Sequence, residues 1–242
     1  ILRFNEALVD EQRPAFLTAP VPVADGPQSR GPMVWGDTEL FAAADAAAWA
    51  DDPTVSLAPV MDPTTVPRDD VAAAVEKAAG LLLLREEVTA PDQLVHGDAL
   101  GCTVYDGYAD PAVVDFVPAW HPTAWSVALL VVDALAWANA EDALLDRWRH
   151  LPDFDQILLR AVIYRLFVHA VLPDSTAEAW PGLARVADIV AVRAGSAPVT
   201  DPGEPLLSGG RATDDSGSTA PADTAGTTAQ TDAGRTPETT EE

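Results

Sequence analysis

"LVHGDALGCTVYDGYADPAVVDFV", residues 94–117, is the stretch of this sequence that decides its fold. Runs containing β-branched residues at 102–106 and 112–117 flank Asp-Gly and Pro, a pattern that predicts a β-hairpin. Asp98 comes just before the first of these strands, and Asp115 lies near the end of the second. Because the start of one antiparallel strand neighbours the end of its partner, the hairpin should bring both carboxylates to the same edge.

Two carboxylates at one edge suit phosphoryl transfer, in which one accepts the proton of an attacking hydroxyl and the other holds Mg²⁺ against phosphates. On this hypothesis Asp98 and His96 are the candidate catalytic residues, and Asp115 is the candidate metal ligand. His96 and Gly97 would shape the loop that presents Asp98. The alternative is that His96 and Asp98 cap a turn and that Asp115 only ends a strand.

The remainder of the ordered chain is helical by its apolar spacing and by the residues at its helix ends. Asp37 is a candidate N-cap, and Pro67 lies in a predicted first turn. The apolar run 124–140 carries Asp133 near its middle and is shorter than a membrane span, which favours a buried helix. Helices are predicted at about 1–12, 37–53, 67–87, 122–139, 141–149, 153–171 and 176–194.

The fold class predicted from this pattern is α+β and mostly helical, with one small β-hairpin and a disordered C-terminal tail. One domain spans residues 1–197. Residues 198–242 form the tail, which is acidic and rich in Thr, Ala, Gly and Pro. Such a composition cannot bury enough apolar surface to offset the entropy lost on ordering.

The charge balance narrows the range of partners. The chain has 38 acidic and 14 basic residues, a formal charge of -24, and this field repels nucleic-acid backbones and anionic membrane surfaces. We therefore predict no nucleic-acid or membrane partner. A single cysteine and the lack of a recognisable signal sequence predict a cytoplasmic location. Because the sequence begins with Ile1 inside a helical pattern, we also expect an N-terminal truncation.

The segment "LVHGDALGCTVYDGYADPAVVDFVPAW" resembles the catalytic segment of the aminoglycoside phosphotransferase and choline kinase-like superfamily. The pairing of "DFVPAWHP" with "VVDALAW" is similar to an actinobacterial branch of that superfamily. The resemblance implies a protein-kinase-like fold, of which residues 1–197 would be the C-terminal lobe, and it implies ATP and Mg²⁺ as cofactors. By this analogy Asp98 matches the catalytic base and Asp115 the metal-binding aspartate, while Val117 replaces a glycine.

Two departures from the family pattern bear on activity. The family has a metal-binding asparagine shortly after the catalytic aspartate, and here those positions hold Cys102 and Thr103. A soft sulfur suits Mg²⁺ poorly, and a threonine hydroxyl would contribute only weakly. The family's nucleotide-binding lobe also needs a lysine and a phosphate-covering loop. The only lysine here is Lys77, in an Ala-rich helix, and no Gly-x-Gly-x-x-Gly segment precedes the catalytic loop.

Several other residues have a functional and a structural interpretation. Cys102 as a nucleophile is the weaker alternative to a packing role. Asp133 would either accept hydrogen bonds from the backbone of the catalytic loop or face solvent at a helix edge. Trp120, Trp125 and Trp137 would either line a substrate pocket or belong to the core. The remaining histidines, which lack metal-ligand spacing, are His121, His150 and His169.

Three functions remain open from the sequence. The leading hypothesis is an ATP-dependent phosphotransferase acting on a small-molecule hydroxyl, and an acidic lobe would suit a cationic acceptor such as an amino sugar. The second is a non-catalytic binding or regulatory protein that keeps the fold but has a degenerate metal site. The third, a purely helical interaction domain, requires that no hairpin forms.

Overall fold

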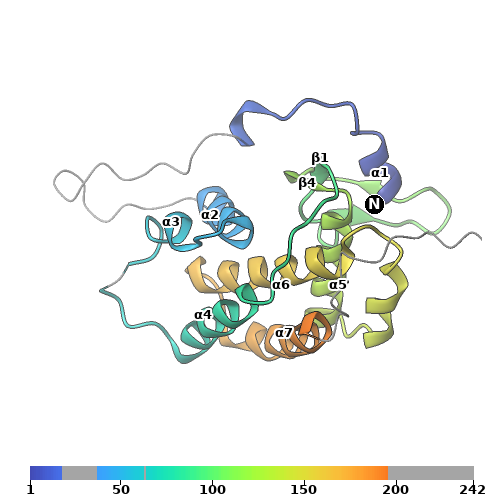
Figure 1. Ribbon diagram of the computed structural model, residues 1–242. Coiled ribbons are helices and arrows are strands. Elements are labelled where there is room, and N and C mark those ends of the chain that lie inside the picture. The colour runs from blue at the N-terminus through green and yellow to red at the C-terminus, as the bar shows by residue number, and fades with distance from the viewer. Residues whose placement is uncertain (18–36, 63, 196–242) are drawn as a thin grey trace, which may run out of the picture. The chain divides into compact units, whose positions relative to one another are not determined.

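A computed structural model of the chain describes residues 1–17, 37–62 and 64–195 (Figure 1). The predicted disordered tail, residues 198–242, lies outside the described residues. Most of the predicted loop after the first helix lies outside them as well.

The described residues form a mostly helical α+β fold with two small antiparallel sheets, which confirms the predicted class. The α-helices are α1 (Leu2–Glu6), α2 (Asp37–Trp49), α3 (Thr54–Leu57), α4 (Asp69–Leu82), α5 (Ala124–Trp137), α6 (Phe154–Val171) and α7 (Trp180–Gly195). Short 3-10 segments are η1 (Ala15–Leu17), η2 (Asp142–Trp148) and η3 (Ala177–Ala179). The strands are β1 (Asp92–His96), β2 (Thr103–Val104), β3 (Ala112–Val113) and β4 (Pro118–Pro122).

The predicted hairpin is present, but it is shorter than expected and lies inside a second strand pair. β2 pairs with β3, with Thr103 opposite Val113 and Val104 opposite Ala112. The predicted strand 112–117 was too long, because pairing within this sheet ends at Val113 and Asp115 lies in the connection to β4. The third hypothesis, which required that no hairpin forms, therefore loses its premise.

Strands β1 and β4 form the outer pair and were not predicted. They are antiparallel, from Asp92 opposite Pro122 to His96 opposite Pro118. β4 begins and ends with proline, which has no N–H to donate and is normally an argument against a strand. A two-stranded sheet has only one paired edge per strand, so it tolerates these residues.

Some helix limits also differ from prediction. The first helix ends at Glu6 rather than near residue 12, and the segment predicted as helix 141–149 forms the 3-10 segment η2. α3, only four residues long, was not predicted. The two long apolar helices α5 and α6 lie within two residues of their expected limits.

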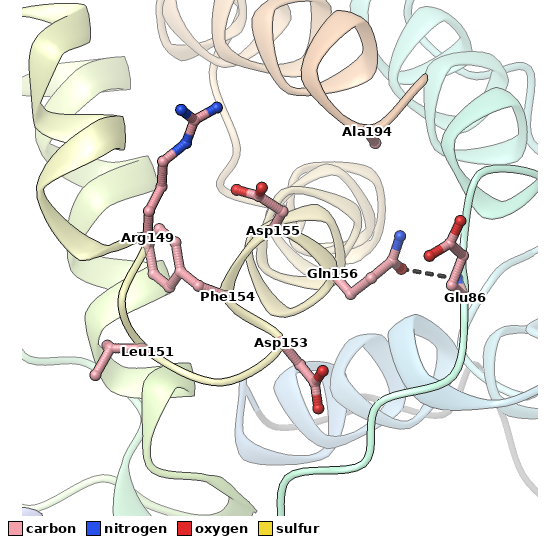
Figure 2. Close-up of a pocket in the computed structure, with 8 residues that line it drawn as sticks. All are labelled: Glu86, Arg149, Leu151, Asp153, Phe154, Asp155, Gln156 and Ala194. Carbon is pink, nitrogen blue, oxygen red and sulfur yellow. Dashed lines mark hydrogen bonds between the residues drawn. The ribbon is translucent and has the colours of Figure 1, made fainter. Parts of the chain in front are cut away.

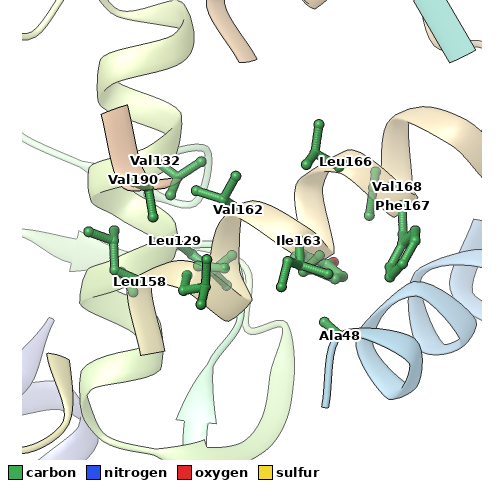
Figure 3. Packing of buried hydrophobic residues seen from close by; sticks show 14 of the residues in the cluster. Ala48, Leu129, Val132, Leu158, Val162, Ile163, Leu166, Phe167, Val168 and Val190 are labelled. Carbon is green, nitrogen blue, oxygen red and sulfur yellow. The ribbon is translucent and has the colours of Figure 1, made fainter. Parts of the chain in front are cut away.

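Helix α6 is the centre of the hydrophobic core. It packs against α2, α4, α5 and α7, so nearly its whole circumference is covered (Figure 1). A helix enclosed in this way must be apolar all round, and Figure 3 shows its side chains packed against residues such as Leu129, Val132 and Val190. The fully buried residues of α6 include Ile157, Leu158, Leu159, Val162, Ile163 and Leu166. The buried polar residues on this helix are therefore conspicuous, and they are Arg160, Arg165 and His169.

Helix α7 approaches α5 closely at Gly182. A Cβ atom at this position would overlap the backbone carbonyl oxygen of Ala136, in the last turn of α5. Any side chain there would push the two helices apart. The glycine therefore sets the distance at which α7 packs on the bundle.

A polar cluster ties the start of α4 to the end of α6. The Nε and Nη2 atoms of Arg68 donate to the two carboxylate oxygens of Asp70 at 3.1 and 3.0 Å, and His169 Nε2 lies 2.8 Å from Asp70 Oδ2. Hydrogen bonding from Arg68 lowers the pKa of Asp70 well below its ordinary value; burial opposes this shift and His169 adds to it. The cluster therefore favours an ionised Asp70 in the folded state.

The lowered pKa of Asp70 predicts an acid-sensitive contribution to stability. The folded-state pKa lies below that of the unfolded chain, so the contribution is complete above about pH 5 and is lost progressively as the pH falls further. We expect Asp70→Asn to be less stable than the parent at pH 7, and the difference should shrink toward pH 2.5. Urea unfolding across this range measures it. Asp69→Asn is the matched control, and an Asp70→Asn difference independent of pH would contradict the prediction.

Candidate functional site

The nested strands bring the candidate residues to one end of the ribbon. The β1–β4 register ends with His96 opposite Pro118, and one step beyond it the Gly97 N–H donates to the Val117 carbonyl at 2.7 Å. Asp98 follows directly on one side of this bond, and Asp115 precedes it on the other. Asp98 and Asp115 were expected at one edge because of the hairpin. In the structure it is the outer strand pair, β1 and β4, that places them there.

His96 connects the two loops that carry the aspartates. Its Nδ1 atom accepts a hydrogen bond of 3.0 Å from the Asp98 N–H, and its Nε2 atom lies 2.9 Å from the carbonyl oxygen of Asp115. The Asp98 N–H needs an acceptor and the Asp115 carbonyl needs a donor. A neutral imidazole with its proton on Nε2 provides both. Burial lowers the pKa of His96, although the hydrogen bond to Asp115 and the nearby carboxylates oppose this, so the neutral form is favoured.

The ring of His96 is fully buried in an aromatic setting. Phe4 and Phe116 lie 5.9 and 5.5 Å from it, measured between ring centroids. With both ring nitrogens bound to backbone, His96 is placed to hold the loops rather than to exchange protons with a substrate. Its predicted role in shaping the loop of Asp98 thus has a geometric basis, and a direct catalytic role for the ring does not.

Residues from distant segments hold the His96 backbone, and sequence analysis did not identify them. Ser126 Oγ donates to the His96 carbonyl at 2.6 Å, and the His96 N–H donates to Asn5 Oδ1 at 3.3 Å. Asn5 Nδ2 in turn donates to Ser126 Oγ at 3.0 Å. All three residues are fully buried. The signal available in the sequence was weak. Asn5 and Ser126 are polar residues inside apolar helical patterns, and buried polar groups require hydrogen-bond partners.

The two residues at the expected asparagine position are directed to local structure. Cys102 is buried, and burial raises the pKa of its thiol, with Asp98 and Asp115 adding to the rise. A thiol held in its neutral form is a poor nucleophile and a poor Mg²⁺ ligand. The Thr103 hydroxyl donates to the Ala99 carbonyl at 2.8 Å, within the loop of Asp98.

The carboxylate of Asp98 is 43% exposed and has a cationic neighbour. Arg165 Nη2 lies 4.0 Å from Asp98 Oδ1, which is an ion-pair distance rather than a hydrogen bond. Arg165 is bound on its other side by Asp133, through Nε to Oδ1 at 2.8 Å and Nη2 to Oδ2 at 2.5 Å. Asp133 therefore takes neither of its predicted roles. It is buried, and its hydrogen-bond donor is the Arg165 side chain rather than the loop backbone.

The other histidines with buried rings form structural pairs. His121 Nε2 lies 2.9 Å from both Asp45 oxygens, and its ring stacks on Trp49 at 4.5 Å between centroids. His169 binds Asp70, as described above. Across the part of the chain that the structure describes, no group of three or more His, Cys, Asp or Glu side chains is arranged to hold a metal ion.

The three tryptophans weighed as pocket residues have different environments. Trp125 is 1% exposed and lies in the core, with ring contacts to Trp49 and Tyr164. Trp120 is half-buried in β4. Trp137 is 46% exposed at the end of α5, and its Nε1 atom donates to the Ala179 carbonyl at 3.2 Å. The core interpretation holds for Trp125, and the three rings do not share one environment.

A hollow of about 250 Å³ lies at the start of α6, and Figure 2 shows its lining. Gln156 Oε1 accepts the Glu86 N–H there at 2.8 Å, and Asp153 Oδ2 accepts the N–H groups of Thr89 and Ala90 at 2.7 and 2.8 Å. These bonds fasten the connector between α4 and β1 to the start of α6. None of the residues that line this hollow belongs to the candidate site, and the full set is Glu86, Arg149, Leu151, Asp153, Phe154, Asp155, Gln156 and Ala194.

Among the described residues, no lysine lies at the candidate site. Lys77 Nζ lies 2.5 Å from Asp188 Oδ1, which joins α4 to α7. Lys77 is therefore a helix-pairing residue, consistent with its position in an Ala-rich helix.

Comparison with protein-family models, with curated proteins and with solved structures gave no match. Within residues 1–17, 37–62 and 64–195, no helix has both the length and the apolar character needed to cross a bilayer.

Proposed function

We propose that this chain is the C-terminal lobe of a kinase-like phosphotransferase that transfers the γ-phosphoryl group of ATP to a hydroxyl of a small molecule. Asp98 accepts the proton of that hydroxyl, and Asp115 holds Mg²⁺. The observation that carries the proposal is the bridge made by His96, which binds the backbone of both aspartates through one ring. A turn cap needs only one of these two contacts, so the bridge favours a shared site over the purely structural alternative.

The donor set fits a magnesium ion held mainly by the nucleotide. Asp115 is exposed and offers hard oxygen ligands, whereas the Cys102 sulfur is buried and the Thr103 hydroxyl is already donated to the backbone. Mg²⁺ commonly binds through one or two carboxylates with water and phosphates completing its shell. Bound in this way, the ion would neutralise charge on the phosphates, while Asp98 orients the acceptor hydroxyl.

The composition of the chain supports the proposed class of acceptor and the proposed cellular location. A strongly acidic chain favours a small-molecule acceptor, with a cationic one such as an amino sugar as the first class to test, over nucleic acid or a membrane surface. The single cysteine is buried and unpaired, which suits a reducing cytoplasm. The nucleotide-covering lobe would come from a segment other than the described helices.

A second function is favoured by one observation. The position of the family's asparagine is occupied by a buried sulfur, and the neighbouring hydroxyl is not free. A non-catalytic binding or regulatory protein that keeps the fold would be expected to lose its metal ligands in this way.

Titration of nucleotide with and without Mg²⁺ distinguishes the two functions. In the longest natural chain containing this sequence, Cys102→Asn should strengthen Mg·ATP binding by about tenfold, because an amide oxygen replaces a soft sulfur. Asp115→Ala should abolish metal-dependent binding, and Asp98→Ala should remove ADP formation while binding persists. Cys102→Ser is the matched control for loss of the sulfur alone. If the parent binds no Mg·ATP and Cys102→Asn restores none, the binding-protein function replaces the enzyme.

A further inference from the structure

A buried ion pair lies between the two most apolar helices of the core. Asp133, in the middle of α5, is 4% exposed, and Arg165 on α6 is 9% exposed. Their two-point contact uses the planar fork of the guanidinium, which matches a carboxylate and fixes its orientation. Burial opposes the charge of Arg165, yet the nearby Asp133 carboxylate holds the pKa of Arg165 above its ordinary range. A permanent positive charge is thus held within the core.

Stability alone does not account for this charge. Replacing a buried ion pair by apolar residues of similar volume is often neutral or stabilising, since burial of both ions costs about what their attraction returns. The guanidinium does have a second neighbour outside the core, since Nη2 lies 4.0 Å from Asp98 Oδ1. Asp133, Arg165 and Asp98 therefore form a line from the core to the partly exposed candidate base.

The Arg165 contact is with one oxygen of Asp98. Oδ1 faces the guanidinium, so Oδ2 is left for another partner. When the Asp98 carboxylate rotates and Oδ1 leaves this fixed cation, part of the attraction is lost, so the observed orientation is favoured. The same positive charge also offsets repulsion between Asp98 and an approaching phosphate group.

We infer that Arg165, held in place by Asp133, is the positioning residue of Asp98. It lies beside Oδ1, favours the orientation in which Oδ2 faces the acceptor hydroxyl, and balances the carboxylate charge when nucleotide is bound. The catalytic part of this inference rests on the proposed phosphotransferase function. The effect of Arg165 on the orientation of the Asp98 side chain does not, and the two parts are measured separately.

The test uses the double variant Asp133→Leu with Arg165→Met in the full chain. Removing both charges avoids an unpaired buried ion, so the thermal midpoint should stay within about 4 °C of the parent. Mg·ATP affinity should change by less than about twofold, whereas slow Mg·ATP hydrolysis, measured as ADP release, should fall by about fivefold, as expected for the loss of a partly exposed ion pair. The single variant Arg165→Lys, which keeps Asp133, should hydrolyse Mg·ATP faster than the double variant and more slowly than the parent. Lysine supplies a cation but cannot make the two-point contact of the guanidinium.

A matched control pair tests whether any lost ion pair slows hydrolysis. Arg193 Nε lies 2.6 Å from Asp155 Oδ1 and joins α7 to α6 away from Asp98. Arg193→Met with Asp155→Leu should leave the hydrolysis rate within about twofold of the parent. Equal loss in both double variants would overturn the positioning role, as would full activity in the Asp133→Leu/Arg165→Met chain.

An NMR measurement separates this inference from the proposed function. The side-chain carboxyl ¹³C signal of Asp98 should shift in the Asp133→Leu/Arg165→Met chain, and its χ1 couplings should average, while the Asp115 signal stays in place. Unchanged Asp98 signals would overturn the inference whatever the activity. If the Asp98 signals respond but the parent neither binds nor hydrolyses Mg·ATP, the proposed function fails and only the fixing of the side chain stands.

Discussion

Asp133→Leu alone should lower the free energy of unfolding by about 3–5 kcal/mol, because it leaves the Arg165 guanidinium buried without its two-point partner. Asp98 would compensate little, since its nearest approach is 4.0 Å and its carboxylate is partly in water. Equilibrium unfolding in urea, followed by far-UV circular dichroism, measures the loss. The effect is large against the 5–15 kcal/mol total stability typical of a domain.

The matched control for Asp133→Leu is Asp142→Leu. Asp142 also pairs with an arginine, Arg185 at 2.7 Å, but both side chains are about half exposed. Its loss should therefore cost less than about 1 kcal/mol. If Asp133→Leu costs no more than this control, Arg165 reaches water or a new partner when Asp133 is absent, and the pair is not a fixed element of the core.

Trp125→Ala should cost about 3–5 kcal/mol of unfolding free energy, the range for removing a large aromatic side chain from a packed core. The indole is 1% exposed and has ring contacts to Trp49, His121 and Tyr164. Both the transfer of its apolar surface and the cavity left behind contribute to this loss. Chemical denaturation of the parent and the variant gives the difference.

Trp137→Ala in the same helix is the control for Trp125→Ala. Trp137 is 46% exposed and makes one hydrogen bond, to the Ala179 carbonyl, so its truncation should cost about 1 kcal/mol. Similar losses in the two variants would show that the core around α5 can collapse onto the missing indole. A Trp125→Ala chain of parental stability would reopen the possibility that this residue faces a ligand.

The pattern of the sequence was sufficient for the helical core and for the short hairpin. Apolar runs as long as α5 and α6 exceed the length of a strand and so indicate buried helices, and Asp-Gly between β-branched runs is a specific turn signal. The outer strands were missed because β1 begins with Asp92, a residue type that strands disfavour, and β4 is bounded by prolines. Their pairing depends on residues distant in sequence, and local propensity does not report such contacts.

The candidate site was predicted in part for the same reason. Asp98 and Asp115 were identified from one local segment, but the residues that hold that segment come from three other helices, through Asn5, Ser126 and Arg165. One of these contacts was accessible to sequence reasoning. Asp133 and Arg165 are charges inside two helices predicted to be apolar, and buried charges must pair. The sequence pattern could not show that Asp98 would lie beside that pair.

The bridge made by His96 also sets how the two loops can move. The imidazole is a planar ring with no internal torsion, so the separation of the Asp98 nitrogen and the Asp115 oxygen is governed by that ring and by two hydrogen bonds of 3.0 and 2.9 Å. A displacement of either loop must be transmitted to the other or must break one of these bonds. The spacing of the two aspartates is therefore set by one buried ring together with the adjacent Gly97–Val117 backbone bond, and neither loop can adjust to a ligand independently while these bonds persist.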